Sequence, residues 1–285
     1  MFSLVSLALG IFLLIIYIAF SFKGLKYESY IESLDDSEYP LKEFYVLGLG
    51  LNDTKLFALR GKAKYALVGN ARLLYEDRYA EFYATIAWAQ TLTFIHISLC
   101  LGFLFAALLN ATLFSFIGIA CAGIFGYYFF SSMKGKVASR RAECLEELPE
   151  IVSTMALLIN SGMTLRETWG VIAESKEGKI YQLMSDALVE MNNGVSDVDA
   201  IHKFGILTDS SDIKKFTSSL VQGIEKGSKD LSDLLAAQSS EMWNLKKQIM
   251  LQKGEAAASK LLLPIALIFL GIMVIVISGA IGMLI

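Results

Sequence analysis

Residues 261–285 read LLLPIALIFLGIMVIVISGAIGMLI, and none of them is Asp, Glu, Lys or Arg. Two further stretches lack charge in the same way, residues 1–22 and residues 82–133. A bilayer core about 30 Å thick needs about 20 apolar residues in a helix. Residues 1–22 and 261–285 each fit one span, and residues 82–133 fit a hairpin of two. We therefore expect four transmembrane helices, because uncharged runs of this length exceed what a buried helix of a soluble core requires.

The composition of the whole chain points to the same class of protein. Of its 285 residues, 55% are hydrophobic and 19% are charged, below the roughly 25% charged residues of an ordinary soluble domain. Mean hydropathy is +0.53. The net charge of −3 indicates no general basic surface for nucleic acid. Three cysteines without paired spacing indicate neither a disulfide framework nor a Cys-based zinc site.

All charged residues fall in two blocks, residues 23–81 and residues 134–260. Lys and Arg follow or precede the spans on the side of these blocks, whereas the hairpin turn at residues 109–112 contains none. Because Lys and Arg are in excess on the cytoplasmic side, we expect both blocks in the cytoplasm and both termini outside. Residues 1–22 are interpreted as an uncleaved anchor, since they lack a basic start and a small-residue cleavage site.

This pattern predicts an all-α integral membrane protein with five successive parts. They are an N-terminal anchor (1–22), a small cytoplasmic helical segment (23–81), a transmembrane hairpin (82–133), a cytoplasmic helical bundle (134–260) and a C-terminal span (261–285).

Within the small segment, apolar residues recur at helical spacing over residues 53–81, which predicts a helix there. Gly48-Leu49-Gly50 is a lone G-x-G without the rest of a dinucleotide fingerprint, and is interpreted as a flexible turn.

The large block contains turn and capping residues that predict six helices, arranged as an antiparallel bundle. Gly162 is expected to end the first helix, and Thr164 begins a capping-box sequence for the next. Gly194 and Gly227 are expected to mark later turns. The last helix continues toward the membrane, where Pro264 is expected to introduce a kink.

The sequence contains no recognisable catalytic motif. There is no phosphate-binding loop of the G-x-x-x-x-G-K-[ST] type and no catalytic or metal-binding signature, so we expect neither an enzyme nor a bound cofactor or metal. His96 lies inside a predicted span, where an ionisable residue can mark a functional site. The favoured interpretation is a neutral side chain that hydrogen-bonds a neighbouring helix. Gly118, Ala122 and Gly126 have the small-residue spacing of close helix packing, either within the chain or with a partner.

The second half of the chain resembles the type II secretion system F domain, found in membrane platform proteins of secretion systems and pili. The resemblance covers about residues 140–285 and lies in the order and spacing of several short stretches. They are Leu148-Pro149-Glu150, residues 161–165, Gly194-Val195, Phe204, residues 220–227, Leu231, Leu234-Leu235, Glu255-Ala256 and residues 260–264. With one evident copy of the domain, the chain looks like the short platform proteins of the tight-adherence (Flp) pilus, the TadB/TadC-like type.

The resemblance implies a non-enzymatic protein of the cytoplasmic (inner) membrane, in contact with lipid. Its implied protein partners are a hexameric secretion ATPase, pilin subunits, and a sister platform subunit or a second copy of the chain. The charged residues considered for the ATPase contact lie in or beside the bundle: Arg140, Arg141, Glu150, Glu167, Glu225, Lys246, Lys247 and Glu255. For any one of them, ordinary surface charge is the simpler interpretation.

Three alternatives remain at this point. A small transporter would carry polar or broken helices at the membrane midplane, and a membrane-bound sensor or enzyme would need a site that no motif reveals. The same platform role could also serve type II secretion, DNA uptake or an archaeal filament.

Overall fold

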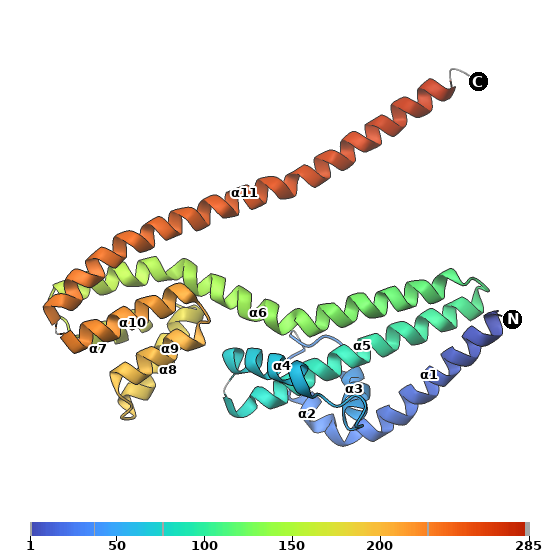
Figure 1. Ribbon diagram of the computed structural model, residues 1–285, viewed down its shortest axis with the longest axis horizontal. Helices are drawn as coiled ribbons and strands as arrows, with labels where there is room; N and C mark the ends of the chain where they lie inside the picture. Colours follow the sequence, from blue (N-terminus) through green and yellow to red (C-terminus); the bar gives the residue numbers. More distant parts are fainter. Residues whose placement is uncertain (1, 37, 76, 227, 283–285) are drawn as a thin grey trace. The chain divides into compact units, whose positions relative to one another are not determined.

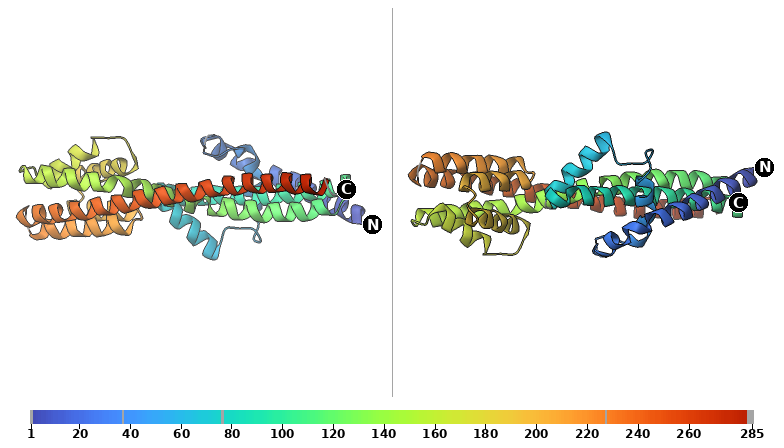
Figure 2. Two further views of the ribbon diagram at one scale, coloured as in Figure 1. Left: turned by 90° about the horizontal axis from the view of Figure 1, so that it is seen from above. Right: turned by 90° about the horizontal axis from the view of Figure 1, so that it is seen from below.

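The computed structural model describes residues 2–36, 38–75, 77–226 and 228–282 (Figures 1 and 2). The described residues are helical and contain no strand, and four of the helices are long and apolar enough to cross a membrane. Both features confirm the expected all-α class with four candidate membrane spans. The chain divides into two compact units, residues 1–140 and residues 141–285, which are described separately below.

Unit 1 is built on three long helices, α1 (Phe2–Gly24), α5 (Ala80–Leu108) and the first part of α6 (Leu113–Asn160) (Figure 1). The turn between α5 and α6 has Asn110 in the left-handed region, with φ of 52°. Gly102 of α5 faces Gly118 of α6 so closely that an added Cβ would lie 2.5 Å from the partner Cα. Ala122 is buried and Gly126 lies against Ile95 of α5. The small residues of α6 therefore pack within the chain.

α1 and α5 are joined by a polar contact between their apolar surfaces. His96 is buried in α5, and its Nε2 lies 2.9 Å from the carbonyl oxygen of Leu13. The carbonyl can only accept, so Nε2 carries the proton and donates. The imidazole also stacks on Tyr17, with ring centroids 6.4 Å apart. This contact agrees with the interpretation of His96 as a side chain that hydrogen-bonds a neighbouring helix.

A short helix that the sequence reading missed is wedged between α1 and α5. The stretch Gly48-Leu49-Gly50, interpreted above as a flexible turn, lies inside α3 (Tyr45–Asn52), which is almost wholly buried. A Cβ at Gly48 would lie 2.0 Å from the carbonyl oxygen of Ala89, and one at Gly50 would lie 2.1 Å from that of Phe20. The two glycines thus allow α3 to approach α5 closely on one side and α1 on the other. They are not needed for flexibility.

Side chains of α5 satisfy the polar groups at the start of α3. The Thr93 hydroxyl accepts from the backbone N–H of Gly48 at 3.1 Å and donates to the carbonyl of Phe44 at 3.4 Å. The Tyr45 hydroxyl accepts from the Gln90 amide at 2.7 Å and donates to the carbonyl of Pro40 at 2.8 Å. These four bonds join the first turn of α3 to α5 and to the preceding loop, and so hold this short apolar helix in place.

The remaining pieces of residues 23–81 are short. They are η1 (Leu25–Tyr27), α2 (Glu28–Glu32), η2 (Lys42–Phe44), α4 (Gly61–Leu74) and η3 (Asp77–Tyr79). The helix predicted over residues 53–81 is therefore wrong at both ends. Asn52 Oδ1 accepts from the backbone N–H of Leu59 at 2.8 Å, which closes a turn before Gly61, and Leu56 is 84% exposed. The apolar spacing over residues 53–60 does not mark a buried face.

Part of this segment packs on α6 near the end of unit 1. Leu67 and Ala71 of α4 share a buried cluster with Met133 of α6. Lys136 Nζ lies 2.5 Å from a Glu38 carboxylate oxygen, which also accepts from the Tyr75 hydroxyl at 3.1 Å. Burial raises the pKa of Tyr75 to about 12. The segment thus holds α6 through apolar and polar contacts together.

Unit 2 contains the rest of α6 and all later helices. These are α7 (Leu165–Ala173), α8 (Lys179–Asn192), α9 (Asp197–Leu207), α10 (Ser211–Lys226) and α11 (Ser228–Gly282). Every one contributes side chains to a single buried cluster, including Leu148 of α6, Trp169 of α7 and Ile201 of α9. The Trp169 indole donates to the carbonyl of Met184 at 2.8 Å and meets the Phe204 ring edge-on at 5.1 Å.

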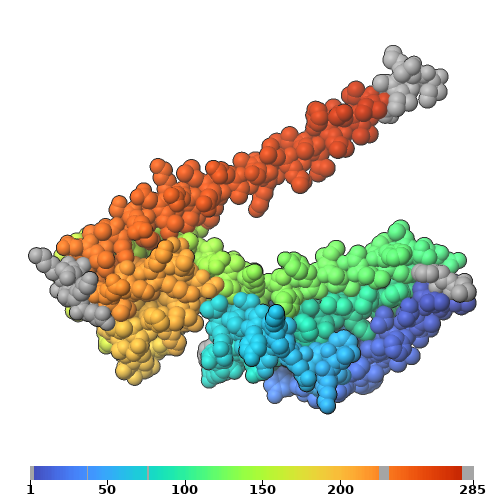
Figure 3. All heavy atoms as spheres, viewed as in Figure 1, coloured from blue at the N-terminus to red at the C-terminus, as the bar shows by residue number. Residues whose placement is uncertain are grey.

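α11 belongs to the core at one end and to an apolar span at the other. Its early residues Leu231, Leu235 and Met242 are buried. Residues 251–277 are all exposed, and residues 261–277 carry no charged side chain. Figure 3 draws this part of α11 in orange and red. A helix that is apolar on all sides is typical of a membrane span. Helix α11 continues through Pro264 without ending.

Candidate functional site

The turn residues of unit 2 have identifiable local roles. Gly162 has φ of +97°, and the backbone N–H groups of Gly162 and Met163 return to the carbonyls of Ile159 and Leu158 at 3.0 and 3.2 Å. These bonds close the end of α6. Thr164 then caps α7 in a capping box with Glu167, whose carboxylate accepts from the Thr164 backbone N–H at 3.0 Å.

The other predicted turn positions fall as follows. Gly194 has φ of +94°, and the N–H of Val195 returns to the carbonyl of Glu190 at 3.0 Å, which ends α8. Pro264 lies inside α11. Gly227 lies outside the described residues, and so does the side chain of Glu225.

The charged candidates for a partner contact do not form one cluster. Arg140 belongs to unit 1, where it donates to the carbonyl of Leu73. Arg141 pairs with Asp209 at 3.7 Å in unit 2. The carboxylate of Glu167 serves the cap of α7, and the backbone N–H of Thr164 lowers its pKa. These residues therefore have structural partners of their own.

Two candidates do come together, on the surface where α6 and α11 run side by side. Glu150 of α6 pairs with Lys176 at 2.6 Å, and Lys246 of α11 lies near enough to act on the same carboxylate. The hydrogen bond from Lys176 lowers the pKa of Glu150, and the charge of Lys246 lowers it further. Lys247 and Glu255 are exposed on α11.

A tryptophan that the sequence reading did not select lies at the centre of this surface. The indole N–H of Trp243 donates to the Ser153 hydroxyl at 2.8 Å, and Lys246 Nζ lies 5.2 Å from the ring centroid. The ring is nevertheless 50% exposed. Its signal in the sequence is a lone indole on a helix whose neighbours Glu241, Asn244 and Lys246 are polar or charged.

We define the docking face as Trp243, Lys246, Lys247 and Met250 of α11 with Glu150 and Ser153 of α6. Trp243, Lys247 and Met250 follow the i, i+4, i+7 spacing that places side chains on one side of a helix. Met250 is 45% exposed. Beside the face, Lys253 of α11 pairs with Glu146 of α6, which ties the two helices together.

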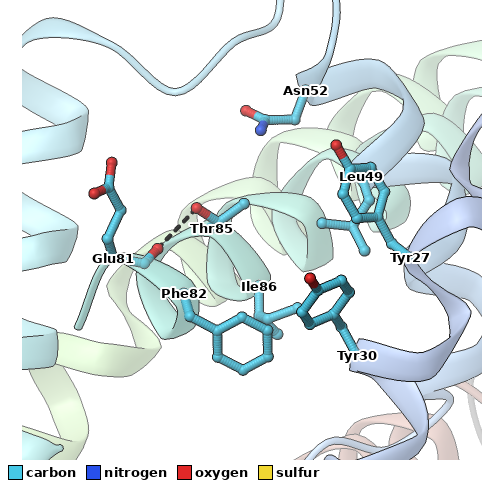
Figure 4. Close-up of a pocket in the computed structure, with 8 residues that line it drawn as sticks. All are labelled: Tyr27, Tyr30, Leu49, Asn52, Glu81, Phe82, Thr85 and Ile86. Atoms are coloured by element: carbon cyan, nitrogen blue, oxygen red, sulfur yellow. Dashed lines mark hydrogen bonds between the residues drawn. The ribbon is translucent and has the colours of Figure 1, made fainter. Parts of the chain in front are cut away.

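Unit 1 contains a separate pocket between η1, α2, α3 and α5, with a volume of about 190 Å³. Its lining residues are Tyr27, Tyr30, Leu49, Asn52, Glu81, Phe82, Thr85 and Ile86. Phe82, Ile86 and Tyr30 lie along one wall, whereas the Glu81 carboxylate points away from them (Figure 4). Glu81 is paired with Lys64. The lining holds no pair of groups arranged for acid–base or nucleophilic catalysis.

Among the described residues, no group of three or more His, Cys, Asp or Glu side chains could hold a metal ion.

Comparison with known families gives a match in the second half of the chain. Residues 151–279, slightly under half of the chain, match the family described as type II secretion system (T2SS), protein F. The matched region begins in α6 and ends in α11, so it contains the docking face except Glu150. No curated protein and no solved structure matches the chain.

The match supports the family resemblance that residues 140–285 carry. The family implies a membrane platform protein of type II secretion and type IV pilus-like systems, which works with an ATPase and other assembly components. Proteins of this family are platform components and not enzymes. The family and the four apolar helices together support a multi-pass protein of the inner membrane.

Proposed function

We propose that this chain is a platform protein of a tight-adherence-type pilus, and that it couples a cytoplasmic secretion ATPase to the assembly of pilin subunits. The observation that carries the proposal is the family match over a single helical bundle that continues into an apolar span. In the two-domain platforms of longer machines, a second bundle of this kind would be expected. Residues 23–81 instead form short helices packed on α1, α5 and α6.

The proposed topology places residues 23–81 and 134–260 in the cytoplasm, as two parts separated in sequence by the transmembrane hairpin. Lys23 and Lys26 follow the first span, Lys134 and Lys136 follow the third, and the α5–α6 turn has no basic residue. Labelling of Asn110→Cys by a membrane-impermeant maleimide tests this arrangement in intact cells, in a variant without the native cysteines. Labelling only after the membrane is permeabilised would indicate the opposite orientation.

The unit 2 helices offer a direct route for coupling. α11 contributes Leu231 and Leu235 to the bundle core and continues without interruption as an apolar helix. A displacement of the bundle by an ATPase would therefore act on the span through a helix and not through a flexible linker. The proposed contacts within the membrane are pilin subunits, lipid and a sister platform subunit or second copy of the chain.

The test is an affinity pull-down of the detergent-solubilised protein from its native cells, followed by mass spectrometry. We expect recovery of a secretion ATPase and of a second, similar platform protein. Recovery of the chain alone, under conditions that preserve other membrane complexes, would contradict the proposal. Recovery of a type II secretion or DNA-uptake machine would retain the platform role and replace the pilus.

A further inference from the structure

The docking face contains an aromatic side chain, Trp243, that is exposed but held in a fixed position. The Trp243 indole N–H is already satisfied by Ser153, whose hydroxyl lies 2.8 Å from that of Ser239. The polar edge of the ring is thus held against α6 while half of its surface stays exposed. Since its orientation is set before any partner arrives, little conformational freedom would be lost on binding. Such anchored aromatic side chains are frequent hot spots of protein interfaces.

The charges around the ring leave a positive excess. Glu146 and Glu150, the carboxylates on the α6 side, are each paired with a lysine, Lys253 and Lys176. Lys246 and Lys247 have no ion pair with any residue that the structure describes. The face therefore presents two cations, Lys246 and Lys247, beside an apolar patch formed by Trp243 and Met250.

Anionic lipid is a poor match for these cations. Lys260 precedes the apolar span, and Lys246 lies fourteen residues earlier on the same helix. At 1.5 Å per residue this separation is about 21 Å along the axis of α11. Interactions between exposed charges are largely screened beyond about 8 Å at physiological ionic strength. A lysine at this height above the headgroups meets a cytoplasmic protein more readily than the membrane surface.

We propose that the docking face binds an acidic surface of a cytoplasmic protein, with Trp243 inserted into an apolar pocket and Lys246 and Lys247 opposite carboxylates. The two lysines without an ion pair and the anchored indole carry this inference. The identity of the partner as the secretion ATPase rests on the proposed function, whereas the chemistry of the surface does not.

The experiment places a photoreactive amino acid at Met250 of the full-length protein in its native cells. We expect an adduct with one cytoplasmic protein, in a peptide from an acidic surface. Trp243→Ala is expected to lower the yield of this adduct at least tenfold, and Lys247→Glu at least threefold, with the protein's abundance unchanged. Lys247 makes no ion pair with a described residue, so its substitution tests the face even if Trp243→Ala loosens the contact between α6 and α11.

Val189→Ala, which alters an exposed side chain of α8, serves as the matched control and is expected to leave the yield unchanged. An adduct with lipid alone, an adduct in a basic surface, or an unchanged yield in both Trp243→Ala and Lys247→Glu would overturn the docking face. An adduct with an acidic protein that does not hydrolyse ATP would support the face and overturn the proposed coupling to an ATPase.

Discussion

The substitution Gly48→Ala tests whether α3 is a tightly packed wedge. The added Cβ would lie 2.0 Å from the carbonyl oxygen of Ala89, which belongs to the backbone of α5 and cannot rotate away. α3 must move off α5, and overpacking of this kind costs about 1–3 kcal/mol. The movement also lengthens the hydrogen bond from the Gly48 N–H to the buried Thr93 hydroxyl, and the loss of such a bond costs about 1 kcal/mol.

Together these terms give a loss of about 2–4 kcal/mol in the stability of unit 1. With a shift of roughly 2–4 °C per kcal/mol for a domain of this size, the unfolding midpoint is expected to fall by about 5–15 °C. The matched control is Gly69→Ala in α4, where an added Cβ meets nothing within 4 Å. An alanine inside an exposed helix is expected to stabilise it by about 0.5–1 kcal/mol, so the two substitutions have opposite signs.

Thiol reactivity on heating provides an assay that separates the two units. Cys100 is buried in unit 1 and Cys144 in unit 2. In a variant that retains only Cys100, a dye that fluoresces on reacting with thiols reports the opening of unit 1, and one that retains only Cys144 reports unit 2. Gly48→Ala should lower the Cys100 midpoint and leave the Cys144 midpoint in place. An unchanged or higher Cys100 midpoint would refute the wedge.

Three further predictions concern the rest of the molecule. Trp169 is 1% exposed, so Trp169→Ala should destabilise unit 2 by about 3–5 kcal/mol, measured as a lower Cys144 midpoint. The control Val171→Ala, at a half-exposed side chain, should cost under about 0.5 kcal/mol. Equal effects of the two substitutions would contradict the assignment of Trp169 to the core. Burial raises the pKa of Tyr75 to about 12, above the value near 10 of an unfolded chain, so its contribution is complete below about pH 10 and is lost as the pH rises toward 12. Tyr75→Phe should remove one ionisation near 12 from the absorbance titration at 295 nm, whereas loss of an ionisation near 10 would show that Tyr75 is not shielded. The double substitution Lys246→Glu with Lys247→Glu should lower filament assembly without lowering the amount of protein, and normal piliation would exclude these lysines from the partner contact.

The spans could be predicted from the sequence because the physics that selects them is local. A charge-free run long enough to cross a bilayer needs no knowledge of its neighbours, and the four helices at residues 1–22, 82–133 and 261–285 follow from that alone. Likewise, Thr164 and Glu167 are three residues apart, so their capping box is visible in the sequence.

α3 could not be predicted in the same way. Its eight residues are too few to show helical periodicity, and two of them are glycines, which usually interrupt helices. What makes the helix stable is supplied by residues far away in sequence, the Thr93 hydroxyl and the Gln90 amide. The role of each glycine is visible only when Ala89 and Phe20 are in place.

The candidate site shows the same limit. Glu150 and Lys246 were among the charged residues considered, but charge alone could not distinguish them from Arg141 or Glu167, whose partners are Asp209 and Thr164. Trp243 was missed because an aromatic residue on a helix is usually part of a core. Its partial exposure depends on how α6 and α11 pack, which no local pattern records.

The continuity of α11 also sets a phase relation between the bundle and the membrane span. Each residue of an α-helix adds about 100° of rotation and 1.5 Å of rise, so the number of residues between Met242 and Lys260 determines which side of the span faces a given direction. One residue inserted there would turn the whole span by about 100°, whereas seven would restore its azimuth to within about 20° and lift it by about 10.5 Å. Angular alignment and height can therefore be varied separately in this helix, simply by counting residues.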